Sequence, residues 1–148
     1  MVWRITHLQT VETSATVGCL RRYTEGILTA QLEFDDPELL LKLETLCEYD
    51  DVPFGLIVMD RSGEVTAYNR WESERAGLSV EKVVGRNFFT SVGPCTDNRL
   101  IAGRFREESD LDEFLDFTFS FRMVVAPVRL RLLAKRGSTH QYLAVVQR

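Results

Sequence analysis

Residues 115–123 read LDFTFSFRM, and their pattern decides the kind of sheet that the chain can build. Apolar residues occupy every odd position and polar residues every even one. The apolar set is Leu115, Phe117, Phe119, Phe121 and Met123. Because successive side chains of a strand point to opposite faces of its sheet, this alternation predicts a strand with one buried face and one wet face.

Four further segments are predicted to be strands. VRLRL (128–132) repeats the alternation, and HQYLAVVQ (140–147) follows it after a turn. Upstream, FGLIVMD (54–60) and EVTAY (64–68) flank a tight turn in which Gly63 can adopt a positive φ. This pair of apolar segments predicts a β-hairpin.

Short helices are predicted between the hairpin and the last three strands. Asn69 is placed to cap a helix that ends at Gly77, and Ser79 opens a second helix that stops at Gly85. Helical spacing also marks residues 97–109, DNRLIAGRFREES. Two strands, a helical crossover and three strands predict an α+β fold, with one five-stranded antiparallel sheet and short helices on one face.

The part of the chain before the hairpin is also predicted to contain helices. Asp36 followed by a proline is typical of a helix start, and the apolar stripe after it ends at Cys47. That position predicts a buried, structural thiol. Residues 17–30 have partly helical spacing, so residues 1–33 are interpreted as an N-terminal helical extension.

Composition excludes several classes of protein. The 148 residues are 45% hydrophobic, which suits one domain with an ordinary core, and the net charge of −4 argues against nucleic acid as a partner. Three cysteines without a CxxC motif favour a reducing, cytoplasmic compartment over a disulfide framework. The sequence has no metal-ligand spacing and no apolar run long enough for a membrane span, so neither a metal nor a membrane is predicted.

Three side chains are candidates for a functional site. Glu72 lies one helical turn after Tyr68, so both can face the same place, and Cys95 sits in the loop-like segment GRNFFTSVGPCTDN (85–98). Each also fits a plainer interpretation: a core tyrosine, a solvated helix acid and a buried inert thiol. Spacing alone does not choose between these. Because neither histidine is in a promising context to serve as a base for the thiol, an enzyme is not predicted.

The order of elements resembles a PAS domain, and the motifs resemble the photoactive yellow protein family. The matching segments are FGLIVMDRSGEVTAYNRWE (54–72), VVGRNFFTSVGPCTDN (83–98), GRFREE (103–108) and DFTFSFRM (116–123). Within them, the pattern GRNFFxxVxPCT is specific to this branch of the PAS superfamily. The resemblance implies a PAS domain over residues 34–148, with residues 1–33 serving dimerisation or output.

The resemblance also implies a chromophore. In the family, the loop cysteine carries 4-hydroxycinnamic acid (p-coumaric acid) as a thioester, and Cys95 holds that place. Tyr68 and a protonated Glu72 would then donate hydrogen bonds to the buried phenolate, which is unstable without them. Light isomerises the chromophore, and the proton moves from Glu72 to the phenolate. The carboxylate left behind is buried and unpaired, and it would drive the signalling state of a blue-light photoreceptor.

The family's chromophore pocket maps onto a set of mostly apolar residues. They are Phe88, Phe89, Pro94, Phe119, Phe121, Met123, Ala76 and Leu78. Ala76 stands where the family's best-studied members have a threonine, and Leu78 stands where they have an arginine. Two hypotheses therefore stay open: a photoreceptor that signals through a downstream protein or a homodimer, and a chromophore-free PAS module for protein interaction or small-ligand sensing.

Overall fold

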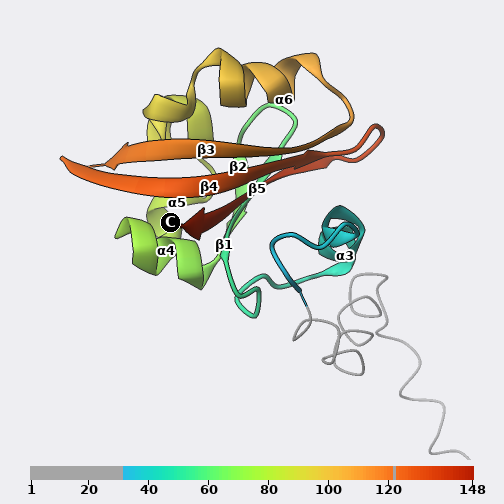
Figure 1. Ribbon diagram of the computed structural model, residues 1–148, viewed down its shortest axis with the longest axis horizontal. Helices are drawn as coiled ribbons and strands as arrows, with labels where there is room; N and C mark the ends of the chain where they lie inside the picture. Colours follow the sequence, from blue (N-terminus) through green and yellow to red (C-terminus); the bar gives the residue numbers. More distant parts are fainter. Residues whose placement is uncertain (1–31, 122) are drawn as a thin grey trace, which may run out of the picture.

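The computed structural model describes residues 32–121 and 123–148, with only the backbone of Phe121, and its strands form one antiparallel sheet (Figure 1). The strands are β1 (Gly55–Asp60), β2 (Val65–Tyr68), β3 (Leu111–Phe121), β4 (Val124–Ala134) and β5 (His140–Gln147). Their order across the sheet is β2-β1-β5-β4-β3. The predicted five-stranded α+β architecture is confirmed. The helix predicted at 17–30 lies outside the described residues.

Two of the three strands inside the sheet, β1 and β5, are buried on both faces, because their sequences are continuous apolar runs rather than alternating ones. The sheet therefore separates two apolar layers. The crossover face is formed by Ile57, Met59, Leu143 and Val145. The α3 face is formed by Leu56, Val58, Tyr142 and Ala144.

The segment between β2 and β3 covers the crossover face, as predicted. It contains α4 (Arg70–Ala76), α5 (Val80–Val83), the short helical turns η2 (Phe88–Val92), η3 (Pro94–Thr96) and η4 (Arg99–Gly103), and α6 (Arg104–Glu107). Buried apolar side chains from this segment complete the layer; they are Val83, Phe88, Phe89, Ile101, Ala102 and Phe105. The predicted cap and stop of α4 are both confirmed: Asn69 caps the helix, and Gly77 ends it with a φ of 66°.

The helix predicted after Asp36 is α3 (Leu39–Thr45), and it lies on the opposite side of the sheet from the crossover helices. Leu39 and Leu43 are fully buried there, together with Phe54. Figure 1 shows α3 apart from α4, α5 and α6. No helix in the described part of the chain is long and apolar enough to cross a membrane.

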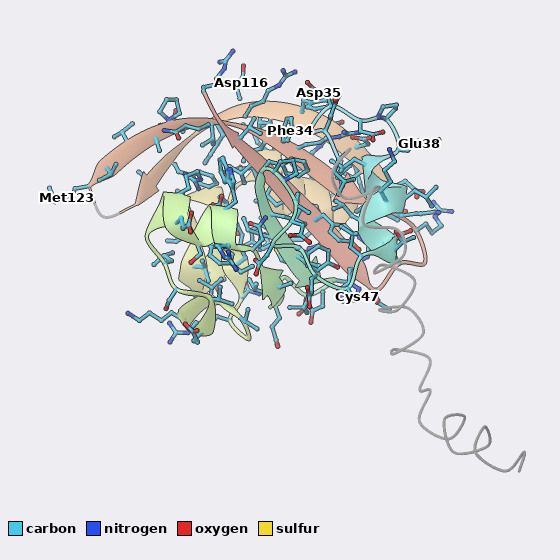
Figure 2. All side chains as sticks on the ribbon, turned by 90° about the horizontal axis from the view of Figure 1, so that it is seen from below. Phe34, Asp35, Glu38, Cys47, Asp116 and Met123 are labelled. Carbon is cyan, nitrogen blue, oxygen red and sulfur yellow. The ribbon has the colours of Figure 1, made fainter. Side chains whose placement is uncertain are left out.

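Two expectations about burial are wrong. Cys47 is exposed, because α3 ends at Thr45 and Leu46 is already extended, so the thiol has left the apolar stripe. Met123 is fully exposed as well, because β3 ends at Phe121 and Met123 adopts a φ of 68° in the turn before β4. Figure 2 shows Met123 at the outer end of the β3–β4 hairpin.

Candidate functional site

The site is built on the junction between β2 and α4, which Asn69 holds in place. The Asn69 side chain is buried, and its Oδ1 accepts hydrogen bonds from the backbone N–H of Leu56 at 2.9 Å and of Glu72 at 3.1 Å. Its Nδ2 donates to the carbonyl of Phe54 at 2.8 Å. These bonds tie the first turn of α4 to β1, so the Glu72 side chain is directed at the sheet rather than at solvent.

Glu72 is a buried acid, with only 2% of its surface exposed. Its carboxylate lies over Gly55 of β1, where a Cβ atom would come within 2.2 Å of Oε2. Burial raises the pKa of Glu72, and hydrogen bonds from the Arg75 guanidinium oppose that rise. The interpretation of Glu72 as a solvated helix acid is therefore wrong, whereas its neighbour Glu74 is exposed as that interpretation requires.

Arg75 is a member of the site that sequence reasoning missed. Its Nε donates to Glu72 Oε2 at 2.9 Å, and its Nη2 donates to Oε1 of the same carboxylate. The guanidinium also lies over the ring of Phe119, 5.1 Å from the centroid. The available signal was the spacing of an acid and an arginine three residues apart on a predicted helix, which places them on one face.

Tyr68 lies beside this pair at the end of β2 and is 5% exposed. Its hydroxyl donates to the main-chain carbonyl of Glu72 across 3.4 Å, a long hydrogen bond that leaves the hydroxyl able to turn to a better acceptor. Burial raises the pKa of Tyr68, and the Glu72 carboxylate raises it further. The structure thus brings the predicted tyrosine and acid together from two elements.

Cys95 lies in η3, on the rim of the same apolar layer. Its side chain is half-buried and packs against the crossover-face core. Asn98 Nδ2 donates to the Cys95 carbonyl at 2.9 Å, and Thr96 Oγ1 donates to the Gly93 carbonyl at 2.6 Å, so the turn that carries the thiol is fixed on both sides. A thiol held in this way is reachable from solvent and borders the interior at once.

The residues predicted to line a pocket divide into three groups. Those buried in the crossover-face core are Phe88, Phe89 and Phe119. Leu78 packs on that core and Ala76 is partly buried at the end of α4, whereas Pro94 is exposed on the surface, as Met123 is. The side chain of Phe121 lies outside the description. Of the predicted lining residues, Pro94 and Met123 therefore face solvent, and the lining role of the others stays a prediction.

A cavity of about 260 Å³ also borders on Tyr68, and it is lined by residues of β2, α5 and the segment after α3. Among these are Tyr49, Asn69, Val80 and Val84. Neither Glu72 nor Cys95 contributes to its wall. Within the described residues, no group of three or more His, Cys, Asp or Glu side chains could hold a metal ion.

Comparison with known proteins finds relatives that share one name, photoactive yellow protein. The chain is 38% identical to the photoactive yellow protein of Rhodothalassium salexigens over 95 residues, which cover 62% of this chain and 74% of that protein. It is 32% identical to the photoactive yellow protein of Halochromatium salexigens over 101 residues, which cover 66% of this chain and 81% of that one. No protein-family model matches the chain.

Solved structures agree with these relatives. The photoactive yellow protein domain of the sensor histidine kinase Ppr from Rhodospirillum centenum superposes with a TM-score of 0.63 at 37% identity, over 67% of this chain and 90% of that domain. The PAS domain of an HTR-like protein from Haloarcula marismortui superposes with a TM-score of 0.59 at 14% identity, over 86% of this chain and 99% of that domain. At that identity, the second likeness concerns the fold alone.

Proposed function

Because the chain belongs to the photoactive yellow protein family, we propose that it is a blue-light photoreceptor that carries 4-hydroxycinnamic acid as a thioester on Cys95. One observation carries the proposal: a tyrosine and a glutamate, both buried, meet at the apolar layer on whose rim the Cys95 thiol packs. Gly55 leaves space for the Glu72 carboxylate, which places a polar group within the otherwise apolar layer. That placement suits a side chain that would bind the phenolate.

Cys95 would serve as the attachment point. Its sulfur attacks the carbonyl carbon of an activated hydroxycinnamoyl donor, the bond from that carbon to the leaving group breaks, and the thiol proton passes to solvent. A half-buried thiol suits this step, because the donor can reach it from outside while the acyl group is received by the core. Phe88, Phe89 and Phe119 would exclude water from the bound ring.

Tyr68 and Glu72 would hold the phenolate oxygen. A buried anion is stable only when hydrogen bonds or a counter-charge replace its water, and these two side chains offer an O–H group each when Glu72 is protonated. The bound group supplies blue-light absorption and a double bond that light isomerises. Glu72 would then give its proton to the phenolate oxygen, which moves the negative charge from the phenolate to Glu72 inside the apolar layer and would loosen the domain.

The output of the protein is proposed to pass through a partner. The similar domain from Rhodospirillum centenum belongs to a sensor histidine kinase, which supports a downstream signalling protein or a homodimer as the receiver. We propose that residues 34–148 form the sensory domain and that residues 1–33 serve dimerisation or output.

Reconstitution tests the proposed function. The full chain is incubated with the anhydride of 4-hydroxycinnamic acid, and its absorption spectrum and peptide masses are recorded. We expect a blue absorption band and one acyl group on the peptide that contains Cys95. Cys95→Ala should lose both signals, whereas Cys47→Ala, which removes an exposed thiol, should keep them.

A wild-type protein that gains neither the band nor the mass would overturn the proposal. The remaining candidate would be a chromophore-free PAS module, and the cavity beside Tyr68 is the observation that favours small-ligand sensing in that case. Its occupant would be sought by native mass spectrometry of the purified chain.

A further inference from the structure

Arg75 places a guanidinium inside the site before any ligand arrives. Its side chain is 8% exposed and that of Glu72 is 2% exposed, so the pair is withdrawn from water. Both carboxylate oxygens accept from the same arginine, one from Nε at 2.9 Å and the other from Nη2. A guanidinium that binds both oxygens in this fork is the arrangement that arginine forms with an ionised carboxylate.

The surroundings offer Arg75 few other partners. Of the elements packed around the carboxylate in the described part of the chain, β2 contributes the Tyr68 hydroxyl, which donates to a main-chain carbonyl. Strand β1 contributes Gly55 and β3 contributes the Phe119 ring, and neither of these titrates. Arg75 therefore provides the positive charge that faces Glu72, and the flat ring of Phe119 supports the guanidinium without competing for its N–H groups.

We infer that Arg75 sets the charge of this site: it holds Glu72 as a carboxylate while the site is unloaded, and it becomes the counterion of a phenolate when one is bound. The second half rests on the proposed function. Glu72 gains the proton that the phenol loses, and Arg75 turns its N–H groups to the phenolate oxygen. The net charge of the site is unchanged, so no buried charge is left without a partner.

The direction of the exchange follows from burial. Arg75 opposes the rise that burial causes in the pKa of Glu72, so a guanidinium that turns away leaves a carboxyl group that binds a proton readily. After the proton leaves Glu72 again, the same guanidinium is within reach of the new carboxylate. Arg75 thus alternates between the Glu72 carboxylate and the phenolate, and it pairs with whichever of the two is ionised.

The first experiment uses the unloaded protein and is independent of any chromophore. Infrared spectra of the full-length wild type and of Arg75→Met are compared in the region of the carboxyl C=O stretch. We expect Arg75→Met to gain the band of a protonated carboxyl, and expect that band to disappear in Arg75→Met/Glu72→Gln. Arg75→Lys, which retains a cation, should restore the wild-type spectrum. A Glu72 that stays ionised in Arg75→Met would overturn the inference.

The second experiment uses the loaded protein, with loading measured by mass. The pH at which the phenolate band is half formed should rise by about 1 to 3 pH units in Arg75→Met, the usual effect of removing an opposite charge a few ångströms away. Arg75→Lys should recover most of the shift. Arg70→Met is the matched control, because Arg70 lies on the same helix with 71% of its side chain exposed and should leave the midpoint unchanged.

The outcomes separate the two proposals. A fully loaded Arg75→Met protein whose midpoint equals that of the wild type overturns the role of Arg75 and leaves the photoreceptor intact. A wild type that takes up no acyl mass overturns the photoreceptor, and the infrared comparison alone then decides whether Arg75 sets the charge of Glu72. Circular dichroism of each variant checks that the fold is kept, and Arg75→Gln, which also removes the positive charge, replaces Arg75→Met if that variant does not fold.

Discussion

Gly55 of β1 leaves the space that the carboxylate of Glu72 occupies. A Cβ atom at position 55 would lie 2.2 Å from Glu72 Oε2 and 3.1 Å from the ring of Trp71, and neither approach is possible without a shift. The acid is buried in the first turn of α4, so it has no free direction in which to move. A glycine inside a strand often marks such a close approach.

Gly55→Ala is expected to lower the free energy of unfolding by about 1–3 kcal/mol, the usual effect of overpacking a core. It should also reduce loading of Cys95 with the chromophore, because the displaced Glu72 carboxylate no longer lies in its place within the apolar layer. Urea denaturation measures the first effect. Gly103→Ala is the control, since its Cβ would meet nothing closer than 3.5 Å, and it should leave stability equal or slightly higher. Equal losses in both variants would contradict this account of Gly55.

Arg131 is expected to be essential for the stability of the α3 face. Its side chain is 2% exposed, and its Nη1 donates to the carbonyls of Phe34 at 2.8 Å and Asp36 at 2.7 Å. Arg131→Met leaves these two carbonyls without their hydrogen-bond donor, and each lost hydrogen bond should lower the free energy of unfolding by about 1–3 kcal/mol. Arg136→Met removes a side chain that is 80% exposed and should change stability by less than about 0.5 kcal/mol. Thermal unfolding in which the two variants coincide would contradict the prediction.

Asn69→Ala should be more damaging than the loss of an ordinary helix cap. Besides capping α4, Asn69 satisfies the Leu56 N–H and the Phe54 carbonyl in the interior, so we expect a loss of about 2–4 kcal/mol. Asn87→Ala removes the cap of η2, whose bonds to Thr90 and Ser62 are exposed, and should cost about 1 kcal/mol. Urea titrations that give the same loss for both would show that the interior bonds of Asn69 add nothing.

The carboxylate of Asp60 should account for part of the acid sensitivity of the fold. Hydrogen bonds from the Ser62 hydroxyl and from the backbone N–H groups of Ser62 and Glu64 lower the pKa of Asp60. A lowered pKa contributes stability that is complete above the unfolded value of about 4 and is lost as the pH falls through the folded value.

The melting temperature of Asp60→Asn should therefore lie below that of the wild type at neutral pH, and the gap should close as the pH falls below about 4. Asp35→Asn, which changes an exposed carboxylate, is the control and should track the wild type at every pH. A gap between wild type and Asp60→Asn that stays constant on acidification would refute the role of the Asp60 charge.

The strands were predictable because their burial follows a local period. The alternation in LDFTFSFRM and the turn at Gly63 predicted the sheet, and Gly63 does adopt a φ of 93°. Met123 departs from the same pattern because β3 ends two residues earlier, and no periodicity marks that point. Cys47 departs for a similar reason, since α3 is shorter than its apolar stripe.

Only three members of the candidate site were predictable, and those through family motifs. Tyr68, Glu72 and Cys95 could be named from the sequence, but the spacing of Glu72 fitted a solvated acid equally well. Arg131 shows the same limit: alternation places it on the polar side of β4, yet that side is covered by the segment before β1. Whether a polar side chain is wet depends on what packs over it, and that partner is distant in the sequence.

The sequence by itself thus determined the order of strands and helices, the cap at Asn69, the turn glycines and the family, because each depends on residues close along the chain or on a shared motif. Tertiary structure alone decided that Glu72 is buried, that Gly55 makes room for it and that Arg75 pairs with it. Burial and ion pairing arise where segments meet, since the cost of removing a charge from water is fixed by every neighbour that surrounds it.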